Sequence, residues 1–224
     1  MRLPAPSAHF SQIVRYGNYV ARRLRRARML ALAADVEKTT ALVLLTGRAL
    51  EDADKPIQDA LADRDAFDDD IDQAAQTSRL ELAARGTDAV KTAPYTLIYP
   101  DGIGYYTAAP LDEEVARYDE LKRRLEEHLP ATDQVRSKTV AAIDVGLDGF
   151  RGAVVALTSA RTAEALASTR LAAATEGWEK QIEKSYGAIV GEVGRATAER
   201  FFPRVRGKKN NAHGADEAGK KSSA

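Results

Sequence analysis

Residues 10–53, FSQIVRYGNYVARRLRRARMLALAADVEKTTALVLLTGRALEDA, decide the expected fold class. Their apolar side chains recur mostly at steps of three and four, which is the spacing of one face of a long helix. These positions are Ile13, Tyr16, Val20, Leu24, Ala27, Ala31, Ala34, Leu42, Leu45 and Ala49. We therefore expect one long helix from about Phe10 to Ala53.

Similar spacing continues downstream. Asp54 suits the N-cap of a second helix with Pro56 in its first turn, and the pattern runs on to a stop at Gly86. The short connection predicts that these two helices are antiparallel neighbours. A third helix is expected from Leu111 to His128.

A fourth helical region is expected to begin at a cap supplied by Thr132 or Asp133 and to last until Phe202. Gly177 is its expected break. Glycines and alanines at 146, 149, 153, 156, 160, 163 and 167 form a stripe of small residues in this region, and Gly187, Gly191 and Gly194 repeat the pattern. A stripe of this kind allows another helix to approach closely.

The composition agrees with long helices. Aromatic residues make up 6% of the chain and charged residues 29%, with much alanine, a mixture typical of helical bundles and coiled coils. We therefore expect a mainly all-α fold, an elongated antiparallel helical bundle or coiled coil. The expected segments are a flexible arm (1–9), a helical hairpin (10–90), a β-hairpin (94–108), further helices completing the bundle (111–203) and a disordered basic tail (204–224).

Compartment and membrane signals are few. The chain has no cysteine, which fits a cytoplasmic protein and excludes disulfides and thiolate sites from this sequence. No apolar run approaches the roughly 18 residues of a transmembrane helix. The first 34 residues contain seven arginines and no acid, the composition of an organelle-targeting segment. The alternative is an ordinary basic helix, which we favour because the apolar periodicity continues past residue 35.

The stretch YTLIYPDGIGYYTAAP, residues 95–110, differs from the rest of the chain. It holds four of the eight tyrosines around a Pro-Asp-Gly turn, which is the turn chemistry of a three-residue β-hairpin loop. Because an isolated hairpin is marginal in water, we expect it to pack on helices or on another chain. The candidate partner-binding residues are Tyr95, Leu97, Tyr99, Ile103, Tyr105 and Tyr106.

Charge is segregated although the net charge is zero. Residues 1–50 carry nine basic and two acidic side chains, whereas residues 51–90 carry four and twelve. In the expected hairpin the two clusters lie about 30 Å or more apart, beyond the range of screened interaction. The candidate polyanion-binding residues are Arg15, Arg22, Arg23, Arg25, Arg26, Arg28, Arg204, Arg206, Lys208 and Lys209, and the candidate acidic docking face is Asp65, Asp68, Asp69 and Asp72.

No catalytic pattern is present. The three histidines stand far apart in the sequence, and the motifs of serine hydrolases, zinc proteases and P-loop proteins are missing. We expect no catalytic residue, no metal site and no cofactor. The expected role is that of a structural protein which self-associates or binds a protein partner through helical surfaces and the tyrosine segment. The alternative is binding of nucleic acid, or of an anionic membrane or granule surface, by the arginine cluster and the tail.

Overall fold

The computed structural model describes residues 1–5 and 7–203, and all regular structure within them is helical. The mainly all-α prediction is confirmed for this part of the chain. The predicted basic tail, 204–224, lies outside it. The elements are α1 (Phe10–Arg26), α2 (Leu30–Asp52), α3 (Asp54–Ala83), the 3₁₀ turn η1 (Ala89–Lys91), α4 (Tyr95–Ile98), α5 (Gly104–Thr107), α6 (Glu114–His128), α7 (Gln134–Val193), α8 (Arg195–Ala198) and the 3₁₀ turn η2 (Glu199–Phe201).

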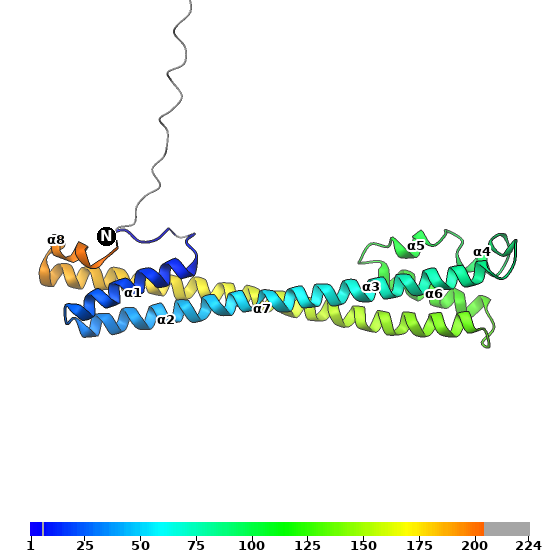
Figure 1. Cartoon of the computed structure of the whole chain (residues 1–224), viewed down its shortest axis with the longest axis horizontal. Coiled ribbons are helices and arrows are strands. Elements are labelled where there is room, and N and C mark those ends of the chain that lie inside the picture. The colour runs from blue at the N-terminus through cyan, green and yellow to red at the C-terminus, as the bar shows by residue number, and fades with distance from the viewer. Residues whose placement is uncertain (6, 204–224) are drawn as a thin grey trace, which may run out of the picture. The chain divides into compact units, whose positions relative to one another are not determined.

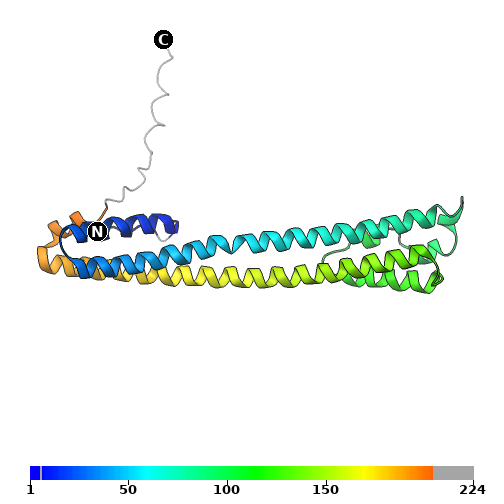
Figure 2. The same cartoon turned by 60° about the horizontal axis from the view of Figure 1, so that its bottom comes forward.

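The chain divides into two compact units. Unit 1 comprises Met1–Ala49 and the described residues from Ser168 onward, and unit 2 comprises Leu50–Ala167. In unit 1, α1 lies beside α2 and the C-terminal part of α7 (Figures 1 and 2). These three helices share one hydrophobic core, which also receives Ala198, Phe201 and Phe202.

The first helix ends earlier than its periodicity suggested. Arg28 adopts a left-handed backbone conformation, with φ 63°. The amide of Met29 donates to the Leu24 carbonyl at 3.0 Å and that of Arg28 to the Arg25 carbonyl at 3.0 Å, the two bonds of a Schellman cap. The expected single helix over 10–53 is therefore two helices, because this cap satisfies the end of α1 and turns the chain into α2.

Trp178 lies at the centre of unit 1 and is 1% exposed. Its indole N–H donates to the Thr40 hydroxyl at 3.1 Å, and its ring meets Tyr16 edge-on at 5.7 Å. A Cβ at Gly17 would collide with both Thr40 and Trp178. The absence of a side chain at Gly17 therefore lets α1 approach α2 and α7 at this point.

The N-terminal arm packs on the same unit. It has no helix, but Met1 and Leu3 lie against the core of unit 1. The Tyr16 hydroxyl donates to the Arg2 carbonyl at 3.0 Å, and burial raises the pKa of Tyr16 to about 12. The predicted arm is thus attached to α1 by both packing and a hydrogen bond.

In unit 2, α3 and α7 approach each other at glycines. Ile71 covers Gly146 and Phe67 covers Gly149, so that a Cβ at either glycine would lie well inside van der Waals contact. Further along, Ile57 and Ala60 share a small cluster with Leu157 and Ala160. Since residue numbers rise on one helix as they fall on the other, α3 and this part of α7 are antiparallel. The close approach predicted for the stripe is present here, whereas no atom comes within 4 Å of the added Cβ at Gly187, Gly191 and Gly194.

The predicted β-hairpin is wrong. Residues 95–98 and 104–107 are single helical turns, α4 and α5, joined by the turn at Gly102, whose φ is 76°. The amide of Tyr99 donates to the Tyr95 carbonyl at 2.9 Å, so the backbone bonds locally instead of across a ladder. At α4 the residues that meet the core, Tyr95, Ile98 and Tyr99, follow helical spacing. Packing on α3 and α6 selects this spacing over the alternation that suggested strands.

The helix α7 runs without interruption from Gln134 to Val193. Its start is capped by Asp133, one of the two predicted residues, whose carboxylate accepts from the Val135 amide at 2.9 Å. The break expected at Gly177 is not there, because this residue lies inside the helix. No helix within residues 1–5 and 7–203 has the apolar run that a membrane crossing requires.

The glycine contact in unit 2 yields a prediction. Gly146→Ala should lower the free energy of unfolding by about 1 to 3 kcal/mol, because Ile71 must move to make room. Gly152→Ala in the same helix is the matched control, since a Cβ there meets nothing within 4 Å and alanine favours the helix by up to about 1 kcal/mol. Urea unfolding measures both changes. Equal effects of the two substitutions would contradict the close approach.

Candidate functional site

The tyrosine segment is used mainly inside unit 2. Tyr99 is 3% exposed, and its hydroxyl hydrogen-bonds the Ser78 hydroxyl and donates to the Ala75 carbonyl at 3.1 Å. Tyr106 is 1% exposed and donates to the Ile98 carbonyl at 2.9 Å. Burial raises the pKa of both phenols, that of Tyr106 to about 12. These two tyrosines anchor α4 and α5 and present no surface to a partner.

The other four predicted partner-binding residues divide unequally. Tyr95, Ile103 and Tyr105 are partly buried against the core of unit 2. The Tyr105 hydroxyl donates to Glu120 at 2.9 Å, and the Arg117 guanidinium lies 4.6 Å from its ring centroid. Leu97 is 47% exposed. Of the six candidate residues only Leu97 therefore offers an exposed apolar side chain.

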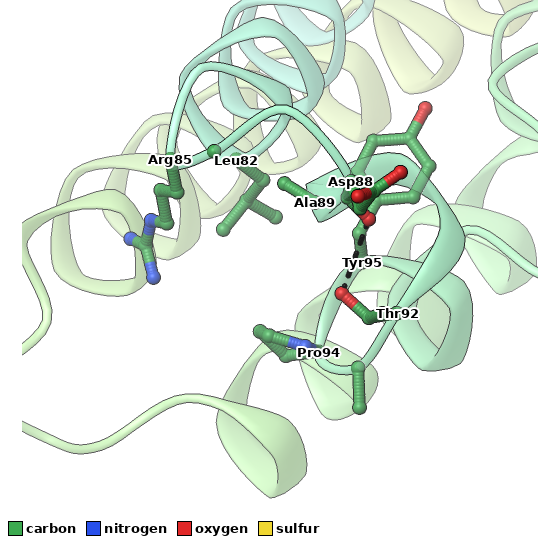
Figure 3. A pocket seen from close by; sticks show the side chains of 9 residues that line it. Leu82, Arg85, Asp88, Ala89, Thr92, Pro94 and Tyr95 are labelled. Atoms are coloured by element: carbon green, nitrogen blue, oxygen red, sulfur yellow. Dashed lines mark hydrogen bonds between the residues drawn. The ribbon is translucent and has the colours of Figure 1, made fainter.

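A hollow of about 300 Å³ lies beside this segment (Figure 3). The guanidinium of Arg85 is bound to Asp133 at 2.7 Å, and the Thr92 hydroxyl donates to the Asp88 carbonyl at 3.2 Å. Arg85 and Thr92 are thus engaged with the protein itself, as is Asp88, whose carboxylate accepts from Lys91 at 3.2 Å. Its lining consists of Leu82, Arg85, Gly86, Asp88, Ala89, Thr92, Ala93, Pro94 and Tyr95.

The arginine cluster forms an exposed face on α1. Arg15, Arg22 and Arg26 are exposed, with the 45% exposed Tyr19 between the first two. Successive steps of four, three and four residues place all four side chains on one side of the helix. This basic face of α1 is thus a continuous strip in unit 1 with an aromatic side chain within it.

The remaining arginines of the cluster have different surroundings. Arg25 is engaged, because its guanidinium forms two hydrogen bonds of 2.5 Å with the carboxylate of Glu37. Arg23 is half-buried and Arg28 is exposed. Within residues 1–5 and 7–203, no ion pair joins an acid to Arg15, Arg22, Arg23, Arg26 or Arg28. The candidates Arg204, Arg206, Lys208 and Lys209 lie outside the described residues.

The predicted acidic docking face on α3 is divided. Asp69 is exposed, and Asp65 is exposed but bonded to Arg64 at 2.6 Å. Asp68 and Asp72 are half-buried and lie near Glu114 of α6. Within the part of the chain that the structure describes, no three acids or histidines are grouped so as to hold a metal ion.

Glu114 is a feature that the sequence did not reveal. It is 2% exposed at the first residue of α6, and its Oε1 has no hydrogen-bond partner among the described residues. Burial, a hydrogen bond to Asp68 and the charges of Asp68 and Asp72 raise its pKa to about 8. Glu114 is therefore mostly protonated at neutral pH.

The neighbouring Asp72 belongs to the same cluster. Burial raises its pKa, and the hydroxyl of Tyr118 donates a hydrogen bond to it. The proton on Glu114 keeps a third negative charge away from Asp68 and Asp72. In the sequence Glu114 resembles any acid in a first helical turn, because its burial depends on α3.

Comparisons with models of protein families, with curated proteins and with solved structures give no match to this chain.

The Glu114 cluster predicts how stability depends on pH. The folded state retains a proton between about pH 4.5 and pH 8 that the unfolded state releases, so stability falls as pH rises through this window. Glu114→Gln should remove this pH-dependent contribution. At pH 8 the free energy of unfolding of the variant should exceed that of the natural protein by about 2 to 4 kcal/mol. Urea unfolding at pH 5, 6.5 and 8 would test this. Parallel pH profiles of the two proteins would contradict it.

Proposed function

We propose that this protein is a non-enzymatic assembly protein, in which oppositely charged units of different copies bind each other. The described part of unit 1 carries 14 basic and 7 acidic side chains, a net charge of +7. Unit 2 carries 13 and 24, a net charge of −11. Residues 204–224 add six basic and two acidic side chains. This segregation is the observation that carries the proposal.

The charge pattern favours contact between unlike units. At physiological salt the Debye length is about 8 Å, so exposed charges attract each other strongly only when two surfaces touch. Complementary surfaces steer encounter and fix orientation, and like-charged surfaces oppose the wrong pairing. A second copy supplies the complementary surface for each unit. The proposal includes a cytoplasmic location, which the lack of cysteine supports.

The absence of enzymatic activity is part of the same proposal. Arg85, Asp88 and Thr92 at the hollow of unit 2 are engaged with neighbouring residues, and His9 and His128 lie in different units. The Ser11 hydroxyl lies 2.9 Å from Nδ1 of His9, but this pair is exposed and neither residue lines the hollow of unit 2.

A second candidate function is polyanion binding by unit 1. Arg15, Arg22 and Arg26 have no ion-pair partner among the described residues, and Tyr19 beside them is able to stack on a base. Retention on heparin that is lost when these three arginines become alanine, in a protein that stays monomeric, would favour this candidate over self-association.

Self-association should depend strongly on salt. Raising the salt concentration from about 0.1 M to about 1 M shortens the Debye length from about 10 Å to about 3 Å, and should dissociate the assembly. Sedimentation velocity over a range of protein concentrations measures this. A monomer at every concentration in low salt would contradict the proposal, as would association that strengthens with salt, which indicates an apolar contact instead.

A further inference from the structure

Two exposed helix faces, one in each unit, have matching patterns. On α1 the face consists of Gln12, Arg15, Tyr19, Arg22 and Arg26, all exposed. On α3 it consists of Asp59, Asp63, Ala66, Asp70 and Gln73, also all exposed. Each set lies within one side of its helix at about 100° per residue. We call them the basic face of α1 and the acidic face of α3.

The charges on the two faces are spaced in mirror order. From Arg15 to Arg22 is seven residues and from Arg22 to Arg26 is four. On α3 the acids follow at four residues, from Asp59 to Asp63, and then at seven, to Asp70. Reversing one helix makes the two patterns coincide over about 16 Å, at 1.5 Å per residue.

We propose that the basic face of α1 in one copy binds the acidic face of α3 in a second copy, with the helices antiparallel. In this register Arg26 faces Asp59, Arg22 faces Asp63 and Arg15 faces Asp70. The inference rests on the proposed function and specifies the surface that carries it. Tyr19 then faces Ala66, and Gln12 faces Gln73.

The charged groups are available for this contact. The three arginines have no ion pair with a described residue, and the same holds for Asp63 and Asp70. Asp59 is bonded to Lys55 at 2.6 Å, but both side chains are largely exposed, 60% and 80%. Exposed pairs of this kind contribute little, so exchanging Lys55 for Arg26 has little cost.

The centre of the contact is apolar. Tyr19 is 45% exposed although its helix packs on the core of unit 1. The small side chain of Ala66 leaves space for a tyrosine ring from a partner helix. Protein interfaces commonly have an aromatic residue buried at their centre and charged or polar residues at their rim. This contact supplies short-range attraction that the charges alone do not.

Nucleic acid is the alternative partner for the basic face of α1. The acidic face of α3 distinguishes it from a second copy of the chain. Phosphates match the arginines of α1 but leave the acids of α3 without a partner. A second copy is the partner that uses both faces at once, and charge complementarity therefore favours it. Substitutions on α3 are accordingly the informative ones.

The test uses two variants of the full chain, Arg22→Asp and Asp63→Arg. Each alone sets like charges against each other in every contact, so its dissociation constant should rise about tenfold or more in low salt. In an equal mixture of the two variants, position 22 on α1 of one variant again faces an opposite charge at position 63 on α3 of the other variant. Sedimentation of the mixture should show association within about twofold of the natural protein.

Arg170→Asp and Asp54→Arg are the matched controls, because they make the same charge changes at exposed positions off the two faces. Their separate and mixed samples should associate like the natural protein. If the natural protein associates but the first two variants do so equally well, or the mixture does not recover, the inference is wrong and the proposed function remains. If the natural protein is monomeric in low salt, or binds heparin without self-association, both are wrong.

Discussion

The close approach of α3 to α7 determines which side of α3 meets the solvent. Phe67 and Ile71 fit over Gly149 and Gly146, where a single added Cβ would force them away. With those two side chains fixed inward, Asp63 and Asp70 lie on one flank of this contact, where they are exposed. The same constraint brings Asp68 and Asp72 toward α6, where Glu114 is buried. Packing at two glycines thus separates a solvated acidic face from a buried carboxyl cluster.

Most of the long helices could be predicted from the periodicity of apolar residues. The end of α1 and the conformation of the tyrosine segment could not. The spacing of apolar residues located α3 and α6 closely, but the break predicted at Gly177 is absent from α7. The spacing missed the end of α1, because the left-handed residue of the cap is Arg28 and not the glycine or asparagine that usually marks such a cap. Turn chemistry around Gly102 correctly indicated a turn with positive φ but suggested strands on both sides. The spacing of Tyr95, Ile98 and Tyr99 is that of a helix, but the tyrosine-rich composition around the Pro-Asp-Gly turn suggested strands.

The site was predictable in part. The run of arginines predicted the segment of α1 that carries the basic face, whereas the exposure of each arginine and its lack of ion-pair partners required the positions of the surrounding residues. The tyrosine segment looked like a binding surface because aromatic residues also mark interfaces. Burial of Tyr99 and Tyr106 assigns these two to the core of unit 2. The protonated Glu114 had no sequence signal, since its pKa depends on residues more than 40 positions away.

Charge segregation and helix packing together produce two complementary faces, and their direct contact is the central claim. Because the chain has no cysteine, Tyr19→Cys and Ala66→Cys each introduce a unique thiol. A disulfide needs Cα atoms within about 7 Å, so it reports contact between these positions. Oxidation of an equal mixture in low salt should give a cross-linked dimer containing one copy of each variant, formed faster than dimers of either variant alone. Cross-linking no faster than with Arg170→Cys in place of Tyr19→Cys would contradict the account.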